Sequence, residues 1–197
     1  MRSMITAVAI LGAAAFIPAG YTAIPDNASA DMSKAVYTAS GSNWEVTTGP
    51  AHILFNAKDM GSTGSATTAT IQQLAKPQHP ESYGVFIGGK DLTDAATRTY
   101  TYFLVRGDGK YMVNVMNGTK ATAVVPWTAS PNVPMEDASG KATYALNVHV
   151  APNEIHFQVN GKLVATVPKG TNPVDGISGL RINHNLHLIV TPVAVSK

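Results

Sequence analysis

The stretch from Glu81 to Val115 contains the strongest structural pattern in the sequence. In its middle part Thr99, Thr101, Phe103 and Val105 alternate with Tyr100, Tyr102, Leu104 and Arg106, and this alternation is typical of a strand whose two faces differ. Gly107 and Gly109 follow, where a tight turn between antiparallel strands needs positive φ angles. The stretch therefore predicts an antiparallel sheet with one face in the core, built from Tyr83–Ile87, Thr99–Val105 and Lys110–Val115.

Short β-branched and aromatic runs between turn signals continue along the rest of the chain. Asn117-Gly118 and Asn160-Gly161 favour hairpins, because both residue types tolerate the left-handed conformation. Lys76–Pro80 and the proline-rich Pro126–Gly140 are expected to be loops. No run has the length and period of a substantial helix. We predict an all-β fold with further strands at Trp44–Thr47, His52–Phe55, Ala66–Leu74, Lys120–Val125, Ala142–Val150, Glu154–Val159, Lys162–Val167, Gly179–Asn183 and Leu186–Val195.

Length and composition indicate one globular domain with a sizeable core. The 197 residues are 45% hydrophobic and 13% charged, which does not suit a disordered chain. The chain has no cysteine, which excludes disulfides and a lipid-modified cysteine. A net charge of +2 without a long basic run gives no reason to expect nucleic acid or an anionic membrane as a partner. No apolar tail that would serve as a membrane anchor is expected either.

The first part of the chain has the pattern of an export signal. A basic second residue precedes the apolar stretch Ile5–Ile17, and Ala28-Ser29-Ala30 offers small residues that signal peptidase accepts. We expect cleavage after Ala30, because a cut after Ala23 would place the bulky Tyr21 three positions before it. An uncleaved anchor is less favoured, since the apolar run is shorter than the ~20 residues that span a bilayer. The predicted organisation is a signal peptide at 1–30 and one domain at 31–197, secreted or periplasmic.

The order of these segments resembles the concanavalin A-like lectin/glucanase superfamily. The similarity extends over 44–195 and includes WEV at 44–46, YGVFIGGKDL at 83–92, YTYFLVRGDGKYMV at 100–113, EIHFQVNGKLV at 154–164 and DGISGLRI at 175–182, followed by LHLIVTPVAV. Within the superfamily it resembles laminin-G-type jelly rolls and the 3-keto-disaccharide hydrolase-like domain. The resemblance implies a two-sheet antiparallel β-sandwich, a concanavalin A-like jelly roll, with carbohydrate as ligand. These motifs are structural, so they carry over no catalytic residue.

The chain lacks the motif that makes members of this superfamily glucanases. Those enzymes place alternate carboxylates of Glu-x-Asp-x-x-Glu in one cleft, whereas Glu45, Glu81, Glu136 and Glu154 each lack a second carboxylate two residues away. There is also no Gly-x-Ser-x-Gly elbow and no glycine-rich loop that leads into a helix. These absences favour a non-catalytic protein.

Four aromatic or planar residues are candidates for contact with a sugar. Tyr100, Tyr102 and Arg106 share one face of their strand, and Trp127 lies in the expected loop after Pro126. Aromatic rings stack on the C–H faces of sugars, and guanidinium groups donate to hydroxyls. The alternative is that the tyrosines pack inside the protein with their hydroxyls at the rim. Trp44 is expected in the core.

The hairpin at 145–160 carries a second polar group. If Pro152-Asn153 forms a two-residue turn, His149 lies opposite His156, and Asn147 lies opposite Gln158. The four can form a solvated outer face, a ligand-binding face or, less favoured because zinc takes three or four protein ligands, a metal site. No cofactor is expected. Calcium, which the resemblance allows, is a weak alternative at Asp91, Asp94 or Asp175.

Together these features favour a non-catalytic, carbohydrate-binding domain. Since the apolar residues that alternate with them must face the core, we expect Tyr102, Arg106, His149, His156 and Gln158 to form one outer ligand-binding face. The alternatives are a glycan- or keto-disaccharide-acting hydrolase, which needs a carboxylate such as Asp91, Asp108 or Glu154 at that face, and a structural or adhesion module.

Overall fold

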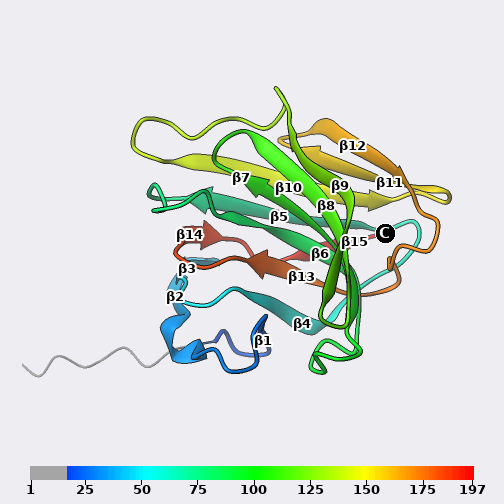
Figure 1. Ribbon diagram of the computed structural model, residues 1–197, viewed down its shortest axis with the longest axis horizontal. Helices are drawn as coiled ribbons and strands as arrows, with labels where there is room; N and C mark the ends of the chain where they lie inside the picture. The colour runs from blue at the N-terminus through cyan, green and yellow to red at the C-terminus, as the bar shows by residue number, and fades with distance from the viewer. Residues whose placement is uncertain (1–16) are drawn as a thin grey trace, which may run out of the picture.

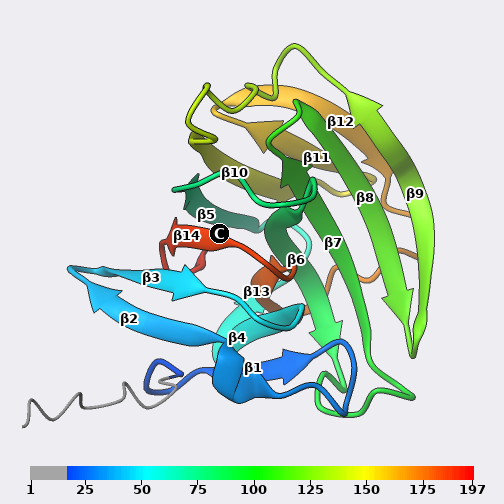
Figure 2. The same ribbon diagram turned by 60° about the vertical axis from the view of Figure 1, so that its left-hand side comes forward.

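The computed structural model describes residues 17–197, which form two antiparallel sheets packed face to face (Figures 1 and 2). The first sheet has the order β1 (Thr22–Pro25), β4 (His52–Gly61), β13 (Gly176–Ile182), β6 (Ser82–Lys90), β7 (Thr99–Arg106), β8 (Lys110–Asn117) and β9 (Lys120–Ala129). The second has the order β12 (Lys162–Pro168), β11 (Glu154–Val159), β10 (Ala142–Val150), β5 (Ala66–Gln73), β14 (His187–Val190), β3 (Asn43–Thr47) and β2 (Val36–Ser40), and β15 (Ala194–Ser196) also pairs with β5. The predicted all-β sandwich is confirmed.

The main core lies between the sheets. Phe103 of β7 and Phe157 of β11 meet across it with ring centroids 5.2 Å apart, and Val105, Val148 and Ile155 are buried in the same cluster. These are the residues that alternation assigned to the interior. Their neighbours along each strand therefore point away from the core, onto the outer face of the sheet to which they belong.

The β10–β11 hairpin has the predicted register. His149 pairs with His156, and Asn147 pairs with Gln158. The next turn, between β11 and β12, places Asn160 at φ 50° and Gly161 at φ 74°, the conformation that this residue pair favours. Local turn chemistry thus fixes which polar side chains stand side by side on the second sheet.

Several predicted strand boundaries were wrong. Strand β9 continues through Pro126 and Trp127 to Ala129, where a loop was expected. Proline is tolerated because β9 is the last strand of its sheet, and an edge strand has N–H groups that pair with no neighbour. The expected strand Leu186–Val195 is divided into β14 and β15. The only helical segment within the described residues is η1 (Met32–Lys34).

The part of the predicted leader that lies within the described residues is built into the domain. Strand β1 extends the first sheet at the edge of β4, with Ile24 paired to Ile53, and Tyr21 packs edge-on against the half-buried Trp44 at 4.7 Å. Residues 1–16 of the predicted leader lie outside the described residues. Within the described part, no helix is long and apolar enough to cross a membrane.

Candidate functional site

The outer face of the first sheet is largely buried. Phe86, Tyr100, Tyr102 and Leu104 form a second apolar cluster there with Ile53, separate from the core between the sheets. Tyr100 is 0% exposed and Tyr102 is 4% exposed. The predicted sugar contact of Tyr100 is therefore wrong for this structure, because a ligand at the surface cannot reach the ring. The alternative prediction, that the tyrosines pack inside, describes both rings.

An ion pair between the buried Arg181 and the half-buried Asp26 joins this cluster to the N-terminal segment. Arg181 of β13 donates two hydrogen bonds of 2.6 Å to the carboxylate of Asp26, and its guanidinium lies 4.8 Å from the centre of the Tyr102 ring. Burial by itself would raise the pKa of Asp26, but the hydrogen bonds and charge of Arg181 bring that pKa below its usual value. Tyr102 also accepts a hydrogen bond from Asn114 at 3.0 Å. Polar groups on this face are thus mostly engaged with one another.

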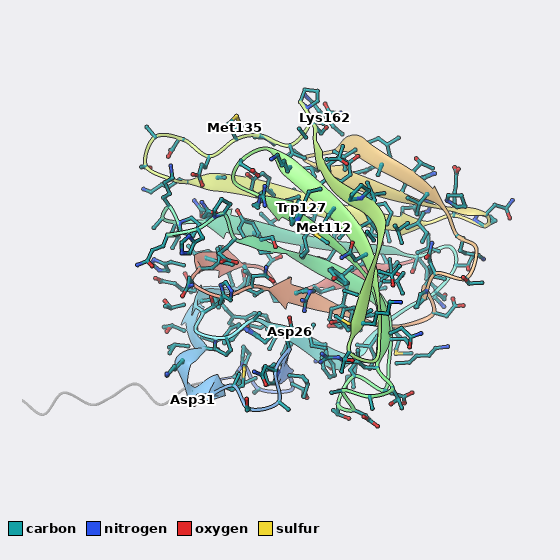
Figure 3. All side chains as sticks on the ribbon, viewed as in Figure 1. Asp26, Asp31, Met112, Trp127, Met135 and Lys162 are labelled. Atoms are coloured by element: carbon teal, nitrogen blue, oxygen red, sulfur yellow. The ribbon has the colours of Figure 1, made fainter. Side chains whose placement is uncertain are left out.

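Beside the cluster, one exposed aromatic ring stands on the same face. Trp127 is 38% exposed, and the guanidinium of Arg106 lies 4.5 Å from its ring centre. Arg106 donates to both carboxylate oxygens of Asp108, at 2.8 and 2.5 Å, and Lys110 lies 3.4 Å from the same carboxylate. Figure 3 places Trp127 beside Met112, over β8 and β9. We call Arg106, Asp108, Lys110, Met112 and Trp127 the tryptophan patch.

The electrostatics of the tryptophan patch keep both charged partners ionised. The hydrogen bonds from Arg106 lower the pKa of Asp108, and the reciprocal hydrogen bonds raise the pKa of Arg106. The bidentate contact with Asp108 therefore fixes the guanidinium beside the indole. The patch presents an aromatic surface, N–H donors and carboxylate acceptors within one small area.

The outer face of the second sheet is open and polar. Asn147, His149, His156 and Gln158 all point to this face and are each half-buried. The imidazole centroids of His149 and His156 are 5.6 Å apart, and His156 lies 2.6 Å from the carboxylate of Glu154. The hydrolase alternative required a carboxylate on this face, and Glu154 supplies a single one, paired with a histidine.

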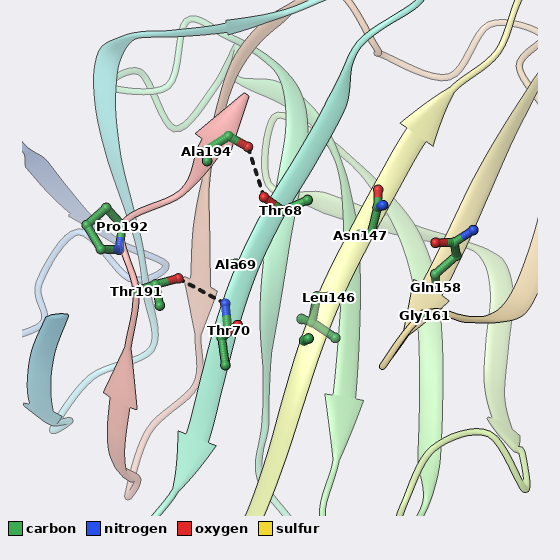
Figure 4. Close-up of a pocket in the computed structure, with 11 residues that line it drawn as sticks. Thr68, Ala69, Thr70, Leu146, Asn147, Gln158, Gly161, Thr191, Pro192 and Ala194 are labelled. Carbon is green, nitrogen blue, oxygen red and sulfur yellow. Dashed lines mark hydrogen bonds between the residues drawn. The ribbon is translucent and has the colours of Figure 1, made fainter. Parts of the chain in front are cut away.

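A groove crosses this second face (Figure 4). Its volume is about 440 Å³, and it runs over β5, β10 and β11 beside the segment that joins β14 to β15. The Thr70 N–H donates to the Thr191 hydroxyl at 2.9 Å, and the Thr68 hydroxyl donates to the Ala194 carbonyl at 3.5 Å. We call it the polar groove, and its lining is Thr68, Ala69, Thr70, Ala145, Leu146, Asn147, Gln158, Gly161, Thr191, Pro192 and Ala194.

The prediction of one shared ligand face was wrong. Tyr102 and Arg106 belong to the first sheet, whereas His149, His156 and Gln158 belong to the second. Because the core-facing Phe103 and Phe157 meet between the sheets, the polar residues next to them in sequence point in opposite directions. Alternation identified the outward residues correctly but did not assign the strands to sheets.

A third feature is a cleft at one end of the sandwich. It has a volume of about 270 Å³ and includes the carboxylates Glu81, Asp108 and Glu136 in its lining. Glu136 accepts a 2.7 Å hydrogen bond from the fully buried Gln73. Each carboxylate has a cationic or histidine neighbour, since Glu81 lies 2.8 Å from His184 and Glu136 lies 3.7 Å from Lys76. This cleft adjoins the tryptophan patch through Asp108.

The aspartates considered for calcium have structural roles. Asp94 accepts a hydrogen bond from the Ala96 N–H at 2.8 Å, and Asp175 accepts one from the Thr63 N–H at 3.2 Å. Asp91 has a positive φ of 51° in a turn. In the part of the chain that the structure describes, no group of three or more His, Asp or Glu residues is arranged to hold a metal ion.

Several residues of these surfaces were missed from the sequence. Arg181 has a detectable signal, because it alternates with the core residues Leu180 and Ile182. Asp108 was named as a possible carboxylate of the hydrolase alternative, but its pairing with Arg106 was not foreseen. Asp26 gave no signal, since it lies in the predicted leader, and Thr191 of the groove lies in a segment that was expected to be continuous strand.

Comparison with known proteins identifies the fold. No known protein family matches the sequence, and no curated protein does. The carbohydrate-binding module CBM66 from Bacillus subtilis has a TM-score of 0.66 at 9% identity, over 90% of this chain and 96% of that one. A Bacillus subtilis protein of unknown function with a galectin-like fold has a TM-score of 0.63 at 12% identity, over 89% of this chain and 88% of that one.

A glycoside hydrolase is similar to the same extent. The family 16 enzyme of a Bacteroides ovatus mixed-linkage glucan locus, in complex with a product, has a TM-score of 0.62 at 9% identity, over 92% of this chain and 96% of that one. Identities this low establish the fold alone. The chain has the concanavalin A-like jelly-roll fold, as the resemblance implied, and shares it with a carbohydrate-binding module and a glucanase.

Proposed function

We propose that the protein is a non-catalytic, lectin-like carbohydrate-binding module that holds a glycan at the tryptophan patch. The observation that carries the proposal is the exposed indole of Trp127, which lies 4.5 Å from a guanidinium whose N–H edge is held by Asp108. An indole offers an apolar plane to the C–H face of a sugar ring, while Arg106 and Asp108 offer donors and acceptors to its hydroxyls. The orientation of the Arg106 guanidinium is set before the ligand arrives, which lowers the entropic cost of binding.

The chemistry of the patch suits binding better than hydrolysis. A glycosidase needs one carboxyl group that is protonated at working pH, to act as the acid, and a second carboxylate across the scissile bond. The pKa of Asp108 is lowered by Arg106, so this group is held in the ionised form. Both of its oxygens already accept hydrogen bonds from Arg106.

The proposal is tested by a glycan array followed by titration. A glycan that binds the chain is titrated into the wild type, Trp127→Ala, Arg106→Ala and the control Leu163→Ala, which removes an exposed apolar side chain from β12 of the other sheet. We expect each patch variant to lower the association constant at least tenfold, about 1.4 kcal/mol, and the control to bind as the wild type does. Circular dichroism verifies that the variants remain folded. Equal binding by all four proteins would exclude the patch.

The neighbouring cleft supports an alternative function, hydrolysis of a glycan. Glu81, Asp108 and Glu136 line it together, and Gln73 positions the Glu136 carboxylate. Incubating the wild type and Glu136→Gln with each bound glycan and measuring new reducing ends decides between the two. Product from the wild type but not from the variant would replace the binding proposal, whereas binding without product supports it.

We further propose that the module acts outside the cytoplasm, with its leader removed upstream of Ile17. Residues 17–30 contribute β1, the Tyr21 contact and the Asp26 ion pair, so cleavage after Ala30 would remove parts of the folded domain. Ala13-Ala14-Ala15 has the small residues that signal peptidase accepts, directly after an apolar run. Intact-mass analysis of protein from the native host is expected to give a chain that begins at Phe16. A chain that begins at Asp31 would reject this placement.

A further inference from the structure

We propose that the polar groove on the second sheet is a separate binding site for an uncharged, hydroxyl-rich chain such as a neutral polysaccharide. The groove lies on the outer face opposite to the tryptophan patch, and the two sites share no residue. The protein would then contact two glycan segments from opposite sides of the sandwich. This goes beyond the proposed function, which needs only the patch.

The lining of the groove specifies a neutral ligand. Figure 4 shows the 11 lining residues, and none of them carries a charge. Their polar groups are the hydroxyls of Thr68, Thr70 and Thr191 and the carboxamides of Asn147 and Gln158. Hydroxyls and amides both donate and accept hydrogen bonds, as sugar hydroxyls do. An ionised ligand would lose hydration here without gaining a charged partner.

One polar atom in the groove has an unmet hydrogen-bonding capacity. Asn147 Oδ1 is buried, and within residues 17–197 it has no hydrogen-bond partner. A buried acceptor without a donor costs about 1–3 kcal/mol, so a ligand that supplies the donor would recover this cost. A turn of the Asn147 carboxamide about its Cβ–Cγ bond would bring this oxygen into the groove, where a ligand hydroxyl can donate to it. The carboxamide of Gln158 stands on the paired position of the next strand, so the two amides lie side by side along the groove.

The size of the groove fits an oligomer. From Thr191, beside β5, to Gln158 on β11 the groove crosses three strand spacings, roughly 14 Å at about 4.8 Å each. Its volume of about 440 Å³ lies within the range of small-molecule sites. Among the lining residues there is no aromatic ring, so we expect weaker binding here than at the tryptophan patch.

The sides of the groove are held in place by the fold. The segment after β14 is fixed to β5 by the Thr191 N–H, which donates to the Thr70 carbonyl at 3.0 Å, and by the reciprocal bond from the Thr70 N–H to the Thr191 hydroxyl at 2.9 Å. On the other side, the Asn160 carboxamide accepts from the Ala145 N–H at 2.8 Å. The groove is thus part of the folded sheet and exists before a ligand binds.

Nuclear magnetic resonance titration of the full chain tests the proposal. The probes are short neutral oligomers of β-1,4-glucan, β-1,3-glucan and β-2,6-fructan, with a sulfated oligosaccharide as the charged comparison. We expect at least one neutral oligomer to shift the backbone amides of β5, β10 and β11, and the sulfated probe to leave them unshifted. The double variant Asn147→Ala/Gln158→Ala should lower the association constant at this face at least tenfold.

The controls separate this site from the patch. Gln72→Ala removes an outward amide of β5 that does not line the groove, and it should bind as the wild type does. Trp127→Ala should leave the groove titration unchanged whether or not the patch binds sugar, so the two proposals fail independently. The groove proposal is overturned if no neutral oligomer shifts these strands, if the double variant binds unchanged, or if the sulfated probe binds equally well.

Discussion

The two outer faces of the sandwich are built by the same strand alternation but have opposite surroundings. On the first face, Tyr100 and Tyr102 are buried in an apolar cluster, and Arg181 is paired with Asp26. On the second face, His149 and His156 occupy equivalent outward positions in β10 and β11 and remain half-buried at an open surface. The difference arises from packing on the first face, where Phe86, Leu92 and Met116 surround the tyrosines and the half-buried Asp26 of the N-terminal segment pairs with Arg181.

Alternation therefore determines which side chains point away from the core between the sheets. It does not determine which residues they contact on the outer face. A face whose apolar and paired side chains pack together becomes a second interior, where loss of a side chain leaves a cavity or an unpaired charge. A face without such packing keeps polar side chains whose loss costs little. The following predictions test this contrast, beginning with the largest effect.

Removing residues 1–30 should abolish most or all of the stability. The truncation deletes β1, exposes the edge of β4 and leaves the guanidinium of Arg181, 7% exposed, without its carboxylate. Breaking a buried pair costs about 3–5 kcal/mol, which is comparable with the whole stability of a marginal domain. The free energy of unfolding in urea measures the effect. A chain that begins at Ile17 is the control and should unfold as the full chain does; equal stability of the two truncations would contradict the role given to residues 17–30.

Equivalent outward residues on the two faces should respond differently to alanine. Tyr102→Ala empties a site that is 4% exposed and is lined by Tyr100, Asn114 and Arg181, so we expect a loss of about 3–5 kcal/mol. His156→Ala shortens a half-buried side chain on the second face and should cost about 0.5 kcal/mol or less. Both are measured by urea unfolding. Similar losses in the two variants would mean that the faces do not differ as described.

The ion pairs of the two faces offer a finer comparison. Asp26→Asn keeps the shape of the side chain but removes the charge opposite Arg181, and it should destabilise by about 2–3 kcal/mol. Glu45→Gln makes the matched change at the Glu45–His187 pair of the second sheet, where both side chains are well exposed, and should cost at most about 0.5 kcal/mol. Thermal unfolding compares the two, and a larger effect for Glu45→Gln would reverse the assignment of the buried face.

Much of the fold could be predicted from the sequence, because local signals dominate it. The Pro152-Asn153 and Asn160-Gly161 turns fixed the register of β10, β11 and β12, and alternation identified Phe103 and Phe157 as core. Strand β1 could not be predicted, since Thr22–Pro25 is short and lies in a stretch whose composition matches a leader. Its formation depends on pairing with β4, which is a tertiary contact.

The candidate sites were predicted less well for the same reason. Trp127, Arg106, Asn147 and Gln158 were all singled out, but their division between two sheets follows from strand order, which periodicity does not contain. The burial of Tyr100 depends on neighbours from other strands, such as Phe86 and Arg181. Residue type and spacing were sufficient to find polar and aromatic side chains, and the topology decided which of them share a surface.

The smallest effect that we expect is on the pH dependence of stability. It distinguishes a histidine between the sheets from a histidine on the second face. His52 is 0% exposed, its Nδ1 lies 2.9 Å from the Pro50 carbonyl, and its Nε2 lies 2.5 Å from the Tyr37 hydroxyl. Nδ1–H therefore donates to the carbonyl, and Nε2 accepts from the tyrosine, whose pKa is raised by burial. This arrangement fits the neutral imidazole, and burial lowers the pKa of His52 below its ordinary value of 6.5.

The sign of the pH effect follows from that lowered pKa. Below pH 6.5 the unfolded chain binds a proton at His52 that the folded chain resists, so stability is complete above this pH and falls as the pH approaches the lower folded pKa. Each tenfold difference in proton affinity between the unfolded and the folded chain corresponds to a loss of about 1.4 kcal/mol. Urea unfolding at pH 7 and at pH 5 measures it, and His52→Gln should reduce the difference between the two pH values. His156→Gln, at the open second face, should retain that difference; if it removes the pH dependence and His52→Gln does not, the titrating group lies on the face and not between the sheets.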